Sequence, residues 1–280
     1  MLKKILPAFF LIGLLSLPIY AQGQSSRSEQ ELQLGMAEYE SWNLAEAIKH
    51  FERAVQLNPG SIKSRFALAE AYTAQYIDVI ETDSDEVAKA NSRLIYRAIE
   101  EYKAVVAIEP TNTQALNNIG AIYRRLFKFK DADVYFRESL KIDPKNKEAL
   151  YRLAVLDWER SFQFRMDTRK TLHLKTGIPL ITSDACSGVS SENLERVEDG
   201  IQLLTRLSTI ANFSEVPAWL SLLYRERADI QCGDLATYER DIQSADDWRR
   251  LACAARASGA ERVPESWPSP PPWSLERCKN

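Results

Sequence analysis

The sequence has 280 residues, of which 45% are hydrophobic and 27% are charged. A chain of this length typically forms one or two domains, and its composition is that of a globular protein rather than a disordered one. Lys and Arg total 36 and Asp and Glu total 39, a net charge of -3. Because there is no cationic surplus, nucleic acid is not expected as a partner. Two histidines are too few for a multi-histidine metal site.

The N-terminus has the order of a secretory signal peptide. Two lysines precede an apolar run, Ile5 to Ile19, and small residues follow the run. We predict a signal peptide over residues 1–21, cleaved after Ala21 or Gly23. Retention as an anchor is the alternative, but the run is short for a membrane span and is broken near its end by Pro18. After cleavage we expect no integral membrane span and a periplasmic or secreted protein.

The rest of the chain repeats a short apolar signature. Leu34 and Leu68 are 34 residues apart, and Ile119 and Leu153 are again 34 apart. Three copies continue to an alanine, an aromatic residue and a proline: Ala47, Phe51 and Pro59; Ala98, Tyr102 and Pro110; Ala132, Phe136 and Pro144. This order and period resemble the tetratricopeptide repeat, a pair of antiparallel helices that buries its apolar faces against neighbouring repeats.

The resemblance implies an all-α fold, a tetratricopeptide-repeat solenoid of about five helix pairs. Segments such as Tyr151–Trp158 also resemble a group of predicted-secreted bacterial tetratricopeptide proteins of undefined function. We expect the repeat domain to span residues 28–258, with repeats near 28–61, 62–112, 113–146, 147–213 and 214–258.

Repeats two and four carry insertions. The insertion in repeat two is expected to lengthen both of its helices, with Asp83 or Ser84 near the cap of the second helix. The insertion in repeat four, at 160–198, is expected to continue its first helix and then to form a loop from Thr176 to Ser191.

The C-terminal part of the chain holds the fifth helix pair and a tail. The helices are expected at Glu215–Ile230 and Tyr238–Ala257. Residues 259–280 contain five of the 12 prolines, so we expect an extended or disordered tail. A plain terminal tail is favoured over a proline-rich ligand for another domain.

Four cysteines, Cys186, Cys232, Cys253 and Cys278, allow three pairings in an oxidising compartment. Cys232 and Cys253 are separated by most of a helix, roughly 20 Å, whereas a disulfide needs Cα atoms within about 7 Å. We predict Cys186–Cys232, because both lie in turns between paired helices, and Cys253–Cys278, which would pin the tail.

Residues that carry chemistry are scarce. The sequence has no Gly-rich phosphate loop, nucleophile elbow or paired zinc-ligand spacing. His50 and His173 are isolated, and Asp246–Asp247 is interpreted as a solvated helix face rather than a cation site. We therefore expect no catalytic residue, no cofactor and no metal.

Function is therefore expected to follow from the concave face, which the first helices of such repeats line. The repeat register places Leu32, Met36 and Glu70 on this face, together with the partner-binding residues named below. The leading hypothesis is a non-catalytic protein-interaction scaffold or adaptor at the bacterial cell envelope, which binds a peptide or protein there. The alternatives are a carbohydrate- or envelope-polymer-associated scaffold and, less favoured, an enzyme that uses the repeat-four insertion. The predicted partner-binding residues are Tyr39, Phe66, Asn117, Arg124, Tyr151 and Trp158.

Overall fold

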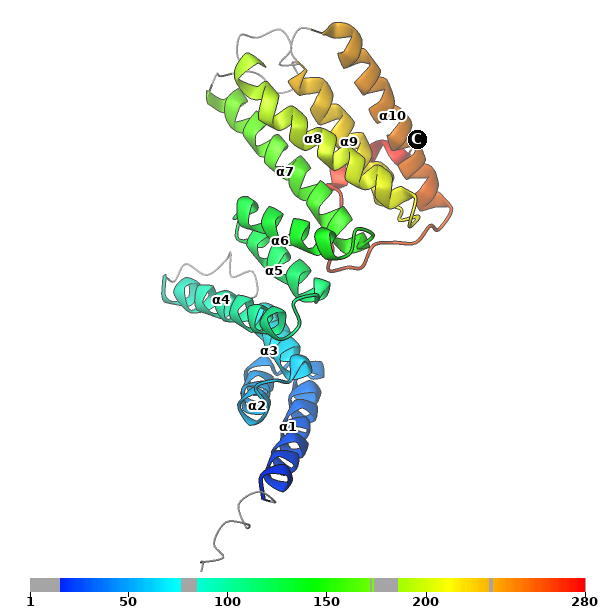
Figure 1. The fold of residues 1–280 in the computed structure, drawn as a ribbon. Helices are drawn as coiled ribbons and strands as arrows, with labels where there is room; N and C mark the ends of the chain where they lie inside the picture. The colour runs from blue at the N-terminus through cyan, green and yellow to red at the C-terminus, as the bar shows by residue number, and fades with distance from the viewer. Residues whose placement is uncertain (1–15, 77–84, 172, 174–185, 232–233, 280) are drawn as a thin grey trace, which may run out of the picture. The chain divides into compact units, whose positions relative to one another are not determined.

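The computed structural model describes residues 16–76, 85–171, 173, 186–231 and 234–279. Its elements are helices, as the sequence pattern predicts (Figure 1). The chain divides into two compact units, residues 1–115 and 116–280, each described here by itself. Residues 1–15, most of the predicted signal peptide, lie outside the described residues. Within the described part, no helix has the length and apolar character that a membrane span needs.

The first unit contains α1 (Ser16–Glu40), α2 (Leu44–Leu57), α3 (Ile62–Gln75), α4 (Asp85–Ile108) and the first residues of α5. α1 packs against α2, and α3 against α4. The approach of α1 to α2 requires glycine at position 35, because a Cβ there would lie 2.5 Å from the Phe51 ring. The core between these helices is formed by buried residues, among them Leu32, Ala47, Phe51, Leu68, Tyr72, Ala98 and Tyr102.

The second unit contains the rest of α5 (Thr113–Arg125), α6 (Phe129–Ile142), α7 (Lys147–Thr171), α8 (Cys186–Ser208), α9 (Val216–Ile230), α10 (Leu235–Ala257) and the 3-10 helix η3 (Pro272–Lys279). A Cβ at Gly120 would lie 2.7 Å from the Phe136 ring, the same close approach as in the first unit. α7 packs against α6, α8 and α9, so it lies at the centre of this unit.

The prolines of the repeat signature mark the helix ends. α2, α4 and α6 each end two residues before a proline: Pro59, Pro110 and Pro144. The residue before proline is disfavoured in helical conformation, and proline itself cannot donate a helical hydrogen bond. The predicted stop signals are therefore confirmed.

The insertions differ in part from expectation. α4 has 24 residues but α3 has only 14, so within the described residues the repeat-two insertion lengthens the second helix alone. Asp83 and Ser84 lie outside the described residues. In repeat four, α7 continues to Thr171 as predicted, but α8 already begins at Cys186, inside the expected loop.

The C-terminal tail is the largest correction to the fold. Residues 261–279, called the strap below, leave α10, cross α7 and end beside α9 and α10 (Figure 1). Val263 and Pro270 are buried, and η3 contacts both helices. The expectation of a plain extended or disordered tail is therefore wrong, because the segment packs on the second unit.

Candidate functional site

A groove of about 850 Å³ lies in the first unit. Most of its lining comes from α1 and α3, with Phe51 from α2 and two residues from the turn before α5 and its first turn. Two of the six predicted partner-binding residues, Tyr39 and Phe66, line it. The apolar side chains that share the walls with them are Leu32, Met36, Phe51, Ile62 and Ala67.

Helical spacing explains why these side chains meet. Leu32, Met36 and Tyr39 are three or four residues apart on α1, and therefore share one face of that helix. Phe66 is oriented by an edge-on contact with the Tyr102 ring, whose centroid is 5.5 Å away. Met36 is 44% exposed, which leaves its flexible thioether side chain open to a ligand.

The groove is acidic. Its lining contains Glu29, Glu40 and Glu70 but a single cation, Lys63. The walls displace water from Glu70 although its side chain reaches the surface, and this burial raises the pKa of its carboxyl. Burial, and then the nearby charge of Glu70, raise the pKa of the Tyr39 hydroxyl. A positive charge beside Glu70 would favour its ionised form.

Asn117 and Arg124 have partners within the second unit. Asn117 is buried, and its Nδ2 donates to Asn146 Oδ1 at 3.0 Å and to Glu148 Oε2 at 3.4 Å. Arg124 donates from Nε to Glu159 Oε2 at 2.7 Å and from Nη2 to the other carboxylate oxygen. Both side chains link α5 to the start or body of α7. Asn117 is too buried to face a partner, which corrects that expectation, whereas the expectation for Arg124 stays a prediction.

Tyr151 and Trp158 belong to the core of the second unit rather than to an open surface. The Tyr151 hydroxyl accepts from Trp219 Nε1 at 2.7 Å and donates to the Pro268 carbonyl at 2.6 Å. Trp158 stacks on Phe162 and meets Trp219 edge-on. The prediction of these two residues as an accessible binding surface is therefore corrected, because α9 and the strap cover α7.

Sequence reasoning missed the residues that cover Tyr151. Trp219, Trp267 and Glu215 form the contacts between α7, α9 and the strap. An available signal was Trp267 itself, one of two tryptophans set among prolines in a segment expected to be exposed. Such a side chain usually finds an apolar partner.

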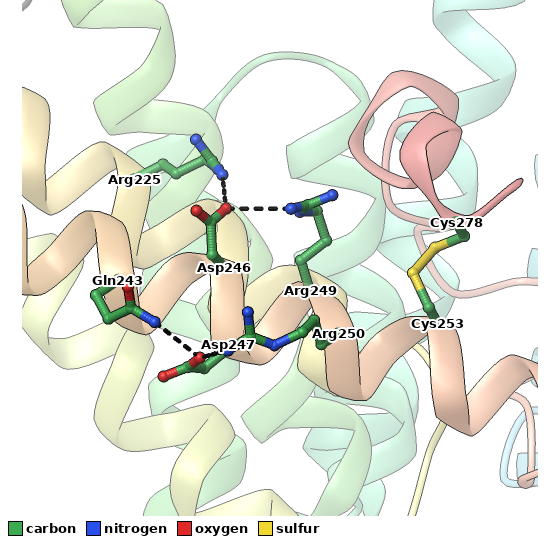
Figure 2. A network of polar contacts seen from close by, with 8 residues as sticks. All are labelled: Arg225, Gln243, Asp246, Asp247, Arg249, Arg250, Cys253 and Cys278. Carbon is green, nitrogen blue, oxygen red and sulfur yellow. Dashed lines mark hydrogen bonds and ion pairs between the residues drawn. A yellow bond between two sulfur atoms is a disulfide. The ribbon is translucent and has the colours of Figure 1, made fainter. Parts of the chain in front are cut away.

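The Cys253–Cys278 pairing expected from the sequence is present, with Cα atoms 5.3 Å apart (Figure 2). The other expected pairing cannot be described, since Cys232 lies outside the described residues. One turn or more before Cys253, Asp246 pairs with Arg225 and Arg249, and Asp247 with Arg250 (Figure 2). These arginines neutralise the two aspartates, so a cation has no unpaired charge to bind there.

Chemistry other than binding finds little support in the described part of the chain. No group of three or more His, Cys, Asp or Glu residues there is arranged to hold a metal ion. The His50 ring bonds to the Glu31 carboxylate through Nδ1 at 2.7 Å, which joins α2 to α1. The groove of the first unit is therefore the candidate site.

Comparison with known proteins addresses the fold. The family model for the tetratricopeptide repeat matches residues 32–61 and 113–146. A structure described as "Crystal structure of MamA protein" has a TM-score of 0.51 at 12% identity, over 86% of this chain and 100% of that chain. "MamA 41-end from Desulfovibrio magneticus RS-1" has a TM-score of 0.50 at 11% identity, over 83% of this chain and 96% of that chain. These similarities bear on the fold alone. No curated protein matches the sequence.

Proposed function

Because the chain belongs to the tetratricopeptide-repeat family, we propose that it is a non-catalytic protein-interaction scaffold whose first unit binds a cationic amphipathic peptide segment. The observation that carries the proposal is the composition of the groove: apolar walls, an exposed Met36, and three glutamates against one lysine. Apolar walls suit the apolar face of a peptide. The acidic excess selects Lys or Arg on its other face.

Glu70 gives this selection a physical basis. Its carboxylate is partly desolvated by the walls, so its ionised form lacks part of the water that would stabilise it. A lysine or arginine of the ligand supplies a counter-charge beside this carboxylate. An anionic ligand would meet like charge there, and a neutral one would leave the carboxylate uncompensated.

A matched pair of probes tests this proposal. A labelled amphipathic peptide of leucine and lysine is titrated against the protein by fluorescence anisotropy, beside a leucine–glutamate peptide of equal length. We expect the cationic peptide alone to bind, with affinity that falls as salt rises. Glu70→Gln should weaken it about fivefold, ~1 kcal/mol for a partly exposed ion pair.

Glu46→Gln is the control for that variant, because Glu46 lies in the same unit but outside the groove, where it pairs with Lys49. It should leave the affinity unchanged. Equal binding of the two peptides, or equal effects of the two substitutions, would contradict the proposal.

We also propose that the scaffold works at the cell envelope. The N-terminal signal pattern supports export, and the Cys253–Cys278 disulfide is of a kind that persists in oxidising compartments. Sequencing of the protein from an envelope fraction should give an N-terminus at residue 22 or 24. Recovery of the chain with Met1 intact from the cytoplasm would overturn this.

A further inference from the structure

The strap is held to the rest of the second unit by hydrogen bonds of its backbone, as a bound peptide would be. Near its start, the Ser214 amide donates to the Glu261 carbonyl at 2.8 Å. Two residues later, the Val263 amide donates to Glu215 Oε2 at 3.1 Å. These contacts use the backbone of the strap, so they fix its position with little demand on its side chains.

The next contacts suit a proline-rich segment. Arg152 Nη2 donates to the Ser266 carbonyl at 3.1 Å, and the Tyr151 hydroxyl donates to the Pro268 carbonyl at 2.6 Å. Both groups on α7 are donors, and both groups on the strap are carbonyl acceptors. Because proline lacks an amide N–H but keeps its carbonyl, a proline in this segment loses none of these bonds.

Trp267 is the side chain of the strap that packs on the face of α7. Its ring centroid lies 5.2 Å from that of Tyr151 and 5.7 Å from that of Phe213. The Arg152 guanidinium lies 6.0 Å from the same ring, within the range of a cation–π contact. An aromatic anchor between two rings, flanked by carbonyl-directed hydrogen bonds, is a typical arrangement for peptide recognition.

Both ends of the strap are held in place. It continues from α10 at one end, and the Cys253–Cys278 bond returns it to α10 at the other (Figure 2). A segment tethered in this way has a high effective concentration at its own site. An external peptide therefore competes poorly while both anchors are intact.

We propose that the face of α7 that carries Tyr151 and Arg152 is a second ligand site, selective for an extended segment with a tryptophan next to proline. The strap is its tethered occupant, and an external segment of the same chemistry replaces it once the strap is loosened. The proposal concerns the second unit and goes beyond the function proposed for the first.

A peptide with the sequence of the strap tests the site. The probe is a labelled synthetic peptide of residues 261–271, titrated against three full-length proteins: the wild type, a Cys253→Ser/Cys278→Ser variant, and that variant with Trp267→Ala added. The wild type should not bind measurably. The added Trp267→Ala should raise the affinity at least about tenfold over the serine variant, since it removes the tethered competitor's anchor.

Two controls and two outcomes decide the test. A probe whose own Trp267 is replaced by alanine should not bind, and Trp267→Phe in the protein should largely keep the probe out. Absence of binding to the triple variant, with helix content intact, would overturn the proposal. So would loss of the folded state when the strap is loosened, because the strap would then be part of the core. Glu70→Gln in the first unit should not alter this binding, so the two proposals fail independently.

Discussion

Phe127 and Trp42 hold left-handed backbone conformations, with φ of 56° and 59°, in equivalent turns after α5 and α1. In the first of these turns, the Phe127 amide bonds to the Arg124 carbonyl and the Lys128 amide to the Tyr123 carbonyl, both at 2.9 Å. This is the Schellman pattern, whose left-handed position usually carries glycine. The Phe127 side chain is 81% exposed, so burial does not offset the strain.

Phe127→Gly should therefore stabilise the protein. Removal of the Cβ relieves the left-handed conformation and should raise the free energy of unfolding by about 1 kcal/mol. The same change at Phe164, 44% exposed inside α7, should lower it by about 1 kcal/mol, because glycine is a poor helix former. Denaturant titrations of both variants check this, and a loss of stability in both would contradict it.

Asp157 is a buried carboxyl without a hydrogen-bond partner among the described residues. Burial raises its pKa well above the usual range, and the charge of Asp199 adds to the effect, while Arg137 opposes it. The carboxyl is therefore protonated in the folded protein at a pH where an unfolded chain has it ionised. Folding takes up a proton, so the contribution to stability is present below the ordinary Asp pKa and lost as pH rises through the folded pKa.

Asp157→Asn tests this linkage. The amide does not ionise, so the variant should gain stability relative to the wild type as pH rises above about 4, by up to ~1.4 kcal/mol per pH unit. Urea titrations of both proteins at several pH values between 4 and 7.5 measure the difference. Parallel pH profiles would show that Asp157 is already ionised in the folded state.

α7 shows which parts of an element the sequence predicts and which it does not. Its length follows from the continued pattern after Trp158, and its predicted extension is confirmed. The repeat register predicts that Tyr151 and Trp158 lie on a face of α7 open to a partner. In the structure, every residue from Ala149 to Trp158 is buried. The apolar run Leu153–Leu156 covers all sides of the helix, which indicates a buried helix rather than an amphipathic one.

The packing of the strap on α7 could not be predicted from the sequence, for a different reason. Its contacts with α7 use its own carbonyl groups, which every residue carries. It has no helical or strand periodicity, and its proline content is equally typical of an unpacked tail. By contrast, the face of α1 that lines the groove was predictable from spacing alone, because Met36 and Tyr39 recur at helical intervals.

At the scale of the molecule, the repeats divide into regular and extended ones. The family model matches residues 32–61 and 113–146, where the second helices, α2 and α6, each have 14 residues. α4, α7, α8 and α10 have 23 to 25 residues and belong to the repeats that it does not match. α1, with 25 residues, is the long helix of a matched repeat. The repeat spacing therefore predicted the fold class, whereas the packing of α9 and the strap over α7 required the structure.

The central claim is that the two units differ in their binding surfaces. The first unit has a groove that is open to ligands, and the second has a face that the strap occupies. Phe66→Ala tests it most directly, with Phe164→Ala as the matched control on a side chain outside the groove. Affinity for the leucine–lysine peptide and thermal stability are measured on both variants. If the groove is the binding site, Phe66→Ala should lower the affinity for this peptide about thirtyfold, ~2 kcal/mol, in a protein that remains folded. Phe164→Ala should leave the affinity unchanged. Wild-type affinity in a folded Phe66→Ala protein would contradict the claim.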